Sequence, residues 1–162
     1  GSGYALGSFW ARKRPVGDGM ELCDILGPGS HGSTYGGSPL ACATALATVG
    51  VILRDDLAAN AKALGTSISD EASTWQVPAL KGIRAFGCMI GLQLDTSVIE
   101  ANEDFKVSGK AASIWVGQLL LDAGLLVIPA GLDVVRLLPP LNASDAEAKE
   151  ALGILKKVLG SI

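Results

Sequence analysis

The residues with the clearest potential for chemistry form a hydroxyl-rich loop, HGSTYGGSPLACA, at positions 31–43. Ser33 and Thr34 place two hydroxyl groups side by side, and the two glycines after Tyr35 permit backbone angles that other residues avoid. Ser38 followed by Pro39 is typical of a helix start, because serine caps the first turn and proline suits the first helical position. Free N–H groups and hydroxyls at a helix start can bind a phosphate. The loop therefore predicts an anion site, although Ser33 and Thr34 could equally bond within a local turn.

Arg136 is a second candidate, because it stands in the middle of the apolar run VVRLL at positions 134–138. Removing a guanidinium group from water is costly unless an anion accompanies it. Its planar, forked donor set fits a carboxylate. The residues alone leave open whether that carboxylate belongs to a substrate or to a neighbouring side chain, or whether Arg136 lies at an exposed sheet edge.

The composition indicates one ordinary globular domain with a core rather than two full domains. The chain has 162 residues, of which 49% are hydrophobic and only 18% charged, and a surplus of apolar surface is typical of a protein with a partner. The formal net charge of −3 argues against nucleic-acid binding. A single histidine, expected to shape its loop rather than to act as a base, and no clustered ligands argue against a metal site.

The cysteines and the absence of targeting signals favour the cytoplasm. Cys23, Cys42 and Cys88 form no CxxC pair, and we expect them to be reduced, with Cys42 and Cys88 buried. The first residues lack the basic start of a signal peptide. The nearly uncharged segment 39–53 is shorter than the roughly 20 residues that span a bilayer, so it predicts a helix buried on every side and no membrane segment.

Hydrophobic periodicity and caps predict the elements that must position these residues. In the first half we expect a strand at 4–11, a short helix around 20–26, the helix at 39–53, and a further helix that begins at Asp55 or Asp56. In the second half we expect strands at 83–86 and 89–94, a helix at 109–123 capped by Ser108, and strands at 125–129 and 134–138. A capping box, Ser144 with Glu147, opens a last helix that ends at Gly160.

This order defines the expected domain organisation. From Lys81 onward the elements run β-β-α-β-β-α, which predicts a small α+β domain with one sheet covered by helices. Residues 1–50 do not complete a domain and are expected to be the tail of a larger one. We therefore expect a large-domain tail at 1–50, a connecting helix at 51–78 and a small C-terminal domain at 79–162.

Two segments about a hundred residues apart resemble the same family, the class III pyridoxal-phosphate aminotransferases of the acetylornithine and ornithine group. The loop at 31–43 resembles the phosphate loop that one subunit lends to the other, and residues 124–141, GLLVIPAGLDVVRLLPPL, resemble the C-terminal domain. The resemblance implies an α/β fragment of the type I fold of these enzymes and a homodimer. It also implies that Thr34 holds the cofactor phosphate, that Ser33 contacts cofactor or substrate, and that Arg136 holds the substrate α-carboxylate.

Two further segments fit this resemblance with departures. Residues 83–92, IRAFGCMIGL, are similar to the family's RGxGLxxG strand pair, with Ala85 and Phe86 departing from it and Arg84 expected to be structural. The start, GSGYALGS, is similar to the turn and strand that follow the lysine of the Schiff base. That lysine is expected a few residues before Gly1, so no residue here is expected to be catalytic, and the chain alone should not bind the cofactor or catalyse transamination.

The resemblance implies a parent enzyme that transfers an amino group from N-acetylornithine, or another ω-amine, to 2-oxoglutarate in arginine biosynthesis, with pyridoxal phosphate as cofactor and small-molecule substrates. One alternative is another member of the class, such as an ornithine or 4-aminobutyrate aminotransferase. A different alternative is a non-catalytic association module whose apolar helix at 39–53 binds a partner. A dinucleotide site is disfavoured, because no GxGxxG follows a predicted strand.

Overall fold

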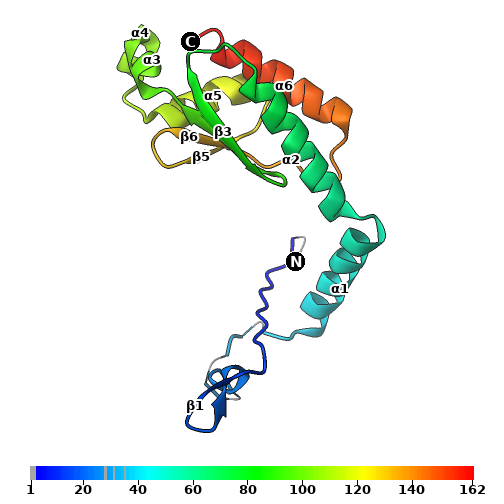
Figure 1. The fold of residues 1–162 in the computed structure, drawn as a ribbon. Helices are drawn as coiled ribbons and strands as arrows, with labels where there is room; N and C mark the ends of the chain where they lie inside the picture. The colour runs from blue at the N-terminus through cyan, green and yellow to red at the C-terminus, as the bar shows by residue number, and fades with distance from the viewer. Residues whose placement is uncertain (1–2, 28, 31, 35) are drawn as a thin grey trace. The chain divides into compact units, whose positions relative to one another are not determined.

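The computed structural model describes residues 3–27, 29–30, 32–34 and 36–162, and it divides the chain into two compact units, Gly1–Asp55 and Asp56–Ile162. Figure 1 traces the helices and strands in chain order. Each unit is described by itself. The sequence predicted a large-domain tail at 1–50, a connecting helix at 51–78 and a small domain at 79–162. This division refers to a larger protein and stays a prediction.

The first unit contains a small antiparallel hairpin, β1 (Pro15–Gly17) and β2 (Met20–Glu21), followed by a 3-10 turn, η1 (Leu22–Asp24). The predicted strand at 4–11 is wrong, because residues 5–14 have no regular structure. Its aromatic side chains satisfy local β preference, but no described strand pairs with this segment. The short helix expected around 20–26 is reduced to η1.

Helix α1 (Pro39–Arg54) confirms the helix predicted after the hydroxyl-rich loop. The Ser38 side chain accepts a hydrogen bond from the Ala41 N–H, and Pro39 occupies the first turn, as the sequence indicated. The expectation of burial on every side is wrong for this chain, since Ala41 is the only buried residue of α1, and Leu46 and Leu53 are each 75% exposed. Cys42, expected to be buried, is exposed as well.

A four-stranded antiparallel sheet forms the centre of the second unit. Its strands are β3 (Leu80–Phe86), β4 (Met89–Leu94), β5 (Ile128–Ala130) and β6 (Val134–Leu137), in the order β3-β4-β6-β5. Burial alternates along the two inner strands, so that one face carries the core side chains Ile90, Leu92, Leu94, Val135 and Leu137. The opposite face is left without a helical cover in this unit.

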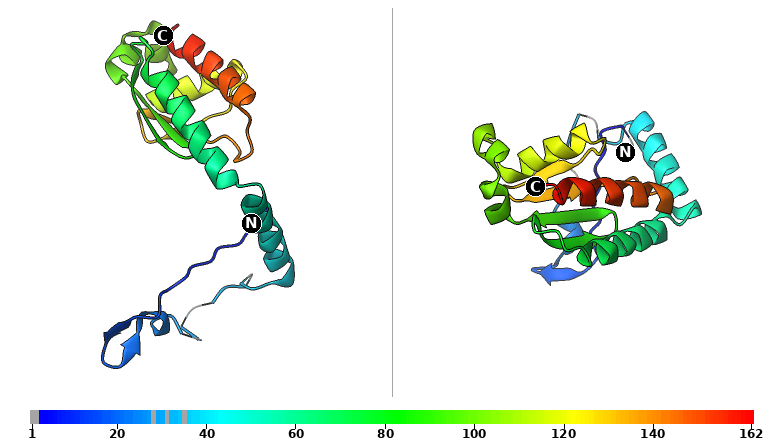
Figure 2. Two further views of the ribbon diagram at one scale, coloured as in Figure 1. Left: turned by 45° about the vertical axis from the view of Figure 1, so that its right-hand side comes forward. Right: turned by 90° about the horizontal axis from the view of Figure 1, so that it is seen from above.

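Three helices cover the core face: α2 (Leu57–Ser73), α5 (Ala112–Asp122) and α6 (Asp145–Leu159). Helix α6 packs against both α2 and α5, as the right-hand view of Figure 2 shows. Buried side chains from all three helices, including Ile68, Val116 and Leu155, join the sheet residues in one cluster. The predicted α+β arrangement, one sheet covered by helices, is therefore confirmed.

Local signals placed most of these elements well. The capping box of α6 is confirmed, because the Ser144 side chain accepts from the Glu147 N–H while the Glu147 carboxylate accepts from the Ser144 N–H. Strands β3, β4 and β6 and helix α2 match their predictions to within a few residues. Strand β5 begins at Ile128, later than the predicted segment 125–129.

The predicted helix at 109–123 needs correction at its start. Ser108 is the last residue of a short helix, α4 (Glu103–Ser108), which follows another short helix, α3 (Thr96–Ala101), and α5 begins only at Ala112. Gly109 adopts a left-handed conformation at φ +63° and ends α4. No helix in the described part of the chain is long and apolar enough to cross a membrane.

Candidate functional site

Two arginines lie in one row across the strands, on the face of the sheet that no helix of this unit covers; we call it the open face. In the ladder, Arg84 of β3 pairs with Gly91 of β4, Gly91 pairs with Arg136 of β6, and Arg136 pairs with Ile128 of β5. Directly paired residues share a face of a sheet. Their neighbours Leu92 and Val135 belong to the buried face, so the row points away from the helices.

Arg136 is the candidate binding residue on this face. It lies on an inner strand, between β4 and β5, and is half-buried. Its Nε atom is buried and has no hydrogen-bond partner within the described part of the chain. A buried charged donor without an acceptor is costly, and a carboxylate bound across Nε and a terminal nitrogen would satisfy it. The geometry therefore favours an anion at Arg136.

A shallow cavity of about 310 Å³ lies over this row. Gly91 contributes no side chain between the two arginines, which leaves the middle of the cavity open. Phe86 and Met89, at the end of the β3–β4 hairpin, form an apolar side of the cavity and are 87% and 56% exposed. The lining residues are Arg84, Ala85, Phe86, Met89, Gly91, Val134 and Arg136.

A buried serine holds the turn that leads into β6. The Ser113 hydroxyl donates to the Gly131 carbonyl at 2.7 Å, and the Ser113 N–H donates to the Leu132 carbonyl at 3.0 Å. On the other side of the turn, the Leu94 N–H donates to the Asp133 carbonyl at 2.8 Å. These bonds tie the β5–β6 turn to α5 and to β4, and so they position the strand that carries Arg136.

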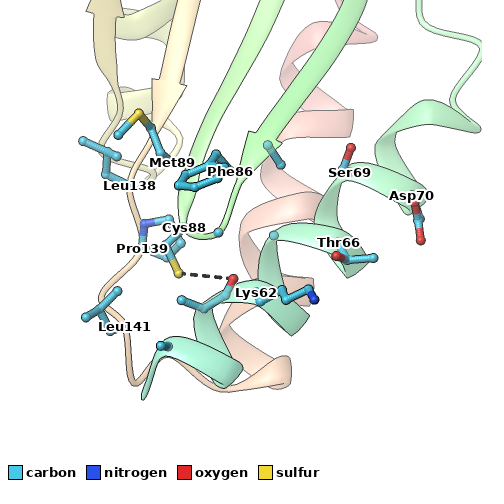
Figure 3. A pocket seen from close by; sticks show the side chains of 15 residues that line it. Lys62, Thr66, Ser69, Asp70, Phe86, Cys88, Met89, Leu138, Pro139 and Leu141 are labelled. Atoms are coloured by element: carbon cyan, nitrogen blue, oxygen red, sulfur yellow. Dashed lines mark hydrogen bonds between the residues drawn. The ribbon is translucent and has the colours of Figure 1, made fainter. Parts of the chain in front are cut away.

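A second, larger cavity of about 860 Å³ is lined by residues of helix α2 and of the β3–β4 hairpin (Figure 3). Phe86, Met89 and Leu138 lie on its hairpin side, whereas Lys62 and Thr66 follow the helix. The thiol of Cys88 donates to the Ala61 carbonyl at 3.9 Å, and burial raises the pKa of this thiol. The expectation that Cys88 is buried is confirmed.

The hydroxyl-rich loop belongs to the first unit, and its described residues form a turn before α1. The Gly36 N–H donates to the Ser33 carbonyl at 3.2 Å. The side chains of Ser33 and Thr34 are exposed, and neither makes a hydrogen bond within the described residues. Among the described residues neither hydroxyl has a hydrogen-bond partner, and Arg136 belongs to the other unit. His31, expected to shape the loop, lies outside the described residues.

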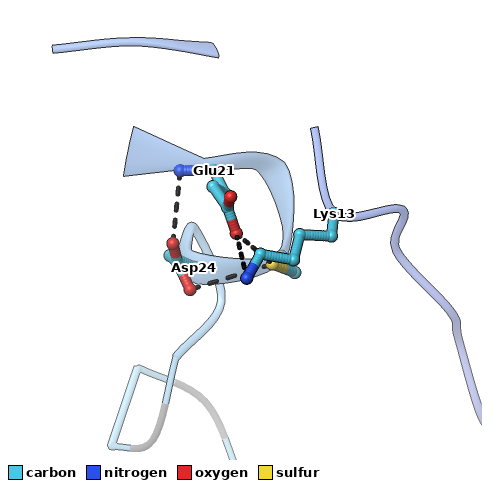
Figure 4. Close-up of polar contacts among 4 residues, drawn as sticks. Lys13, Glu21 and Asp24 are labelled. Atoms are coloured by element: carbon cyan, nitrogen blue, oxygen red, sulfur yellow. Dashed lines mark hydrogen bonds and ion pairs between the residues drawn. The ribbon is translucent and has the colours of Figure 1, made fainter. Parts of the chain in front are cut away.

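A small cluster of polar residues lies near the hairpin of the first unit, and its contacts join residues that are close in the sequence (Figure 4). Potential ligand atoms of Glu21, Cys23 and Asp24 lie within 4.8 Å of one another. The Glu21 carboxylate pairs with Lys13 Nζ at 3.5 Å, and the Asp24 carboxylate accepts from the Glu21 N–H at 3.2 Å. Asp24 thereby caps the turn η1, and Glu21 forms an ion pair with Lys13.

Sequence reasoning assigned Arg84 a structural place and did not consider Gly91. The signal was present in the spacing, because a two-residue hairpin at Gly87 and Cys88 pairs Phe86 with Met89 and therefore Arg84 with Gly91. Strands β4 and β6 are more than forty residues apart in the sequence, and their pairing is seen only in the folded sheet.

The known proteins that resemble this chain are aminotransferases. Residues 7–159 match the family model for class-III aminotransferases. An acetylornithine aminotransferase from Nostoc sp. is 31% identical over an alignment of 165 positions, which covers all of this chain and 34% of that protein. An ornithine aminotransferase from Staphylococcus carnosus is 35% identical over 156 residues, which is 96% of this chain and 36% of that protein. The chain thus spans about a third of the length of these relatives.

The fold agrees with the sequence comparison. A crystal structure of the ornithine aminotransferase from Toxoplasma gondii superposes with a TM-score of 0.72 at 31% identity, covering 88% of this chain and 32% of that one. That structure contains pyridoxal phosphate at partial occupancy in its active site. The architecture is therefore that of an aminotransferase. The chain belongs to the class-III aminotransferase family.

Proposed function

We propose that this chain is the C-terminal part of a pyridoxal-phosphate-dependent aminotransferase that moves an amino group between an ω-amine and 2-oxoglutarate. N-acetylornithine is the proposed donor, and the cytoplasm is the proposed location. The observation that carries the proposal is the guanidinium group of Arg136, half-buried on the open face with an unpartnered Nε. The comparisons support transamination, and ornithine or 4-aminobutyrate remain alternative donors.

Arg136 binds the α-carboxylate of the amino acid or 2-oxo acid in this proposal. A bidentate pair fixes both the position and the plane of the carboxylate, so the reacting carbon is held in one orientation. The two flanking strands hold the backbone of Arg136, and the Ser113 bonds secure the turn before it. The arginine therefore contributes orientation, and it performs no proton transfer.

The residues of the hydroxyl-rich loop fit a phosphate group. The free hydroxyls of Ser33 and Thr34 precede the capped start of α1, and a helix start of this kind favours an anion. Thr34 would hold the cofactor phosphate in the site of the other subunit of a homodimer, and Ser33 would contact the cofactor or the incoming substrate. When bound, pyridoxal phosphate supplies the electron sink that makes a proton on the substrate carbon acidic. No lysine of this chain is assigned the catalytic role, so the chain alone is expected to be inactive.

The test of the proposed function is a substitution of Arg136 in the longer enzyme that carries this sequence. Arg136→Gln should raise the KM for 2-oxoglutarate by about 10- to 100-fold, because a charge-assisted bond contributes roughly 1.5–3 kcal/mol. The absorbance of the bound cofactor should stay unchanged. Lys149→Gln in the exposed part of α6 is the control for loss of one positive charge. An unchanged KM in the Arg136 variant would refute the assignment.

The apolar surface of α1 supports a second candidate, an association module. Leu40, Leu46, Val49, Val51 and Leu53 are all exposed in this chain. A helix with this surface favours burial against a partner, which in the proposed enzyme is a second subunit. Sedimentation of the purified chain separates the outcomes, since a clean monomer at high concentration would contradict association through α1. Leu46→Asp should abolish any dimer that forms.

A further inference from the structure

We propose that Ser113 and Asn60 are positioning residues for Arg136, and that they act by fixing the two ends of the strand β6 that carries it. The inference rests on the proposed function, in which Arg136 binds a substrate carboxylate. It adds two side chains that affect the substrate only through Arg136. Each of them binds backbone carbonyl groups that are distant in the sequence, 18 residues away for Ser113 and 81 and 83 residues away for Asn60.

The sheet by itself holds β6 over a short length. Strand β6 has four residues and its outer neighbour β5 has three, of which Pro129 has no N–H group to donate. The ladder with β4 ends at Leu137, and the prolines at 139 and 140 also lack an N–H group. The segments at both ends of β6 therefore depend on contacts with the helices.

The first turn of α5 holds the segment before β6. Ala111 at the cap position has no side chain that could accept a hydrogen bond, so the first N–H groups of α5 need other acceptors. The Leu132 carbonyl accepts the Ser113 N–H at 3.0 Å, and the Gly131 carbonyl accepts the Ser113 hydroxyl at 2.7 Å. The turn thus caps the helix while the helix fixes the turn. Because Ser113 is completely buried, loss of its hydroxyl leaves a carbonyl without a partner.

The first turns of α2 hold the segment after β6. The side-chain amide of Asn60 donates to the Leu141 carbonyl at 2.7 Å and to the Ala143 carbonyl at 3.1 Å. The Ala143 N–H donates to the Pro140 carbonyl at 3.0 Å and closes the turn between them. The fixed backbone angle φ of Pro139 and Pro140 makes the link from β6 to this turn stiff. One amide group therefore fixes the point at which the chain leaves β6.

Two fixed ends matter for Arg136 because a bidentate pair depends on both the position and the plane of the guanidinium group. Arg136 lies midway between the anchored carbonyls, five residues after Gly131 and five residues before Leu141. A displacement of about 1 Å that begins far from the substrate is enough to weaken such a contact. Loss of either anchor lets β6 shift, and the guanidinium group moves with it.

The test measures substrate binding in the longer enzyme that carries this sequence. Ser113→Ala and Asn60→Ala should each raise the KM for 2-oxoglutarate by about three- to tenfold. The value of kcat should stay within about twofold, because the weakened contact is present in the ground state and the transition state alike. The dissociation constant of glutarate, an unreactive analogue, should rise by a similar factor in calorimetry.

Asn102→Ala is the matched control for loss of a structural side chain. Asn102 is half-buried like Asn60, and its side chain accepts from the N–H groups of Asp104 and Phe105 at the start of α4. This variant should lower the melting temperature and leave both the KM and the glutarate affinity unchanged. If Ser113→Ala or Asn60→Ala behaves in the same way, the residue has only a structural role and the proposal is refuted.

A double-mutant cycle tests whether the two residues act through Arg136. In the Arg136→Gln background, Ser113→Ala or Asn60→Ala should raise the KM no further, because the contact that they position is already lost. Effects that add fully to that of Arg136→Gln would overturn the proposal. If Ser113→Ala does not fold, Ser113→Cys replaces it, since cysteine has a similar size and is only a weak donor. An unchanged KM in Ser113→Cys would refute the role of Ser113.

The outcomes separate this inference from the proposed function. If Arg136→Gln leaves the KM and the glutarate affinity unchanged, the assignment of Arg136 fails and this proposal fails with it. If Arg136→Gln weakens binding but Ser113→Ala or Asn60→Ala does not, only the positioning of Arg136 from both ends of β6 is refuted.

Discussion

The backbone of Gly65 in α2 lies directly against the carbonyl group of Gly87 at the β3–β4 hairpin. A Cβ atom built on Gly65 would lie 2.1 Å from the Gly87 oxygen and 2.8 Å from its carbonyl carbon. Both atoms belong to the backbone, so neither can move aside by a change of rotamer. Gly65 therefore sets how closely the helix approaches the hairpin that carries Phe86 and Met89.

Substitution of Gly65 by alanine should destabilise the protein. The added methyl group must push α2 away from the hairpin, and overpacking of this kind costs about 1–3 kcal/mol. Gly153→Ala in α6 is the matched control, because nothing lies within 4 Å of a Cβ at that position. The control should stabilise by about 0.5–1 kcal/mol through helix propensity. Urea unfolding compares the two variants, and equal midpoints would contradict the close contact.

The cap of α6 should be measurable through Ser144. Its hydroxyl accepts from the Glu147 N–H at 3.3 Å, so Ser144→Ala leaves a first-turn donor without its partner. The free energy of unfolding should fall by about 1 kcal/mol. Ser144→Thr keeps the acceptor oxygen and should retain most of the stability. A threonine variant as unstable as the alanine variant would point to packing rather than capping.

The other half of the capping box should be sensitive to acid. Hydrogen bonds from the Ser144 N–H and hydroxyl hold the pKa of Glu147 below its usual range. A carboxylate whose pKa is lower in the folded state stabilises fully above its unfolded pKa, and this contribution is lost as the pH falls through the folded value. The difference in unfolding free energy between the wild type and Glu147→Ala should therefore shrink from neutral pH to about pH 3. A difference that stays constant would contradict the lowered pKa.

The thiols should react at different rates. Cys88 is 7% exposed and burial raises its pKa, so a thiol reagent should label it only slowly in the native protein. Cys23 is exposed and should react quickly, even though partial desolvation and the neighbouring Asp24 and Glu21 raise its pKa. Mass spectrometry of labelled peptides at several times, with and without denaturant, distinguishes them. Fast labelling of Cys88 in the native state would contradict its burial.

Sequence reasoning succeeded where the information is local. A capping serine, a proline and a run of small residues were enough to place α1, and Ser144 with Glu147 placed the start of α6. Helix α2 followed from an apolar stripe at spacings of three and four. The same kind of signal misled at Ser108, because its hydroxyl donates to the Phe105 carbonyl inside α4 instead of capping α5.

Features that depend on contacts with residues far away in the sequence were harder to predict from the sequence. The segment 4–11 has strand-forming side chains, but strand formation also needs a neighbouring strand. The apolar composition of α1 predicted burial, yet what covers a helix cannot be read from the helix itself. For the candidate site, the apolar run around Arg136 predicted an anion. The position of Arg136 in one row with Gly91 and Arg84 required the register of three strands.

The position of β3 at the edge of the sheet has an evolutionary consequence. Arg136 lies on a strand bonded on both sides, so its replacement disturbs two ladders, whereas β3 is bonded only to β4. Substitutions on an outer strand perturb fewer neighbours and are more readily tolerated by natural selection. The outer strand can therefore vary in sequence at a smaller cost in stability than the inner strand that carries Arg136.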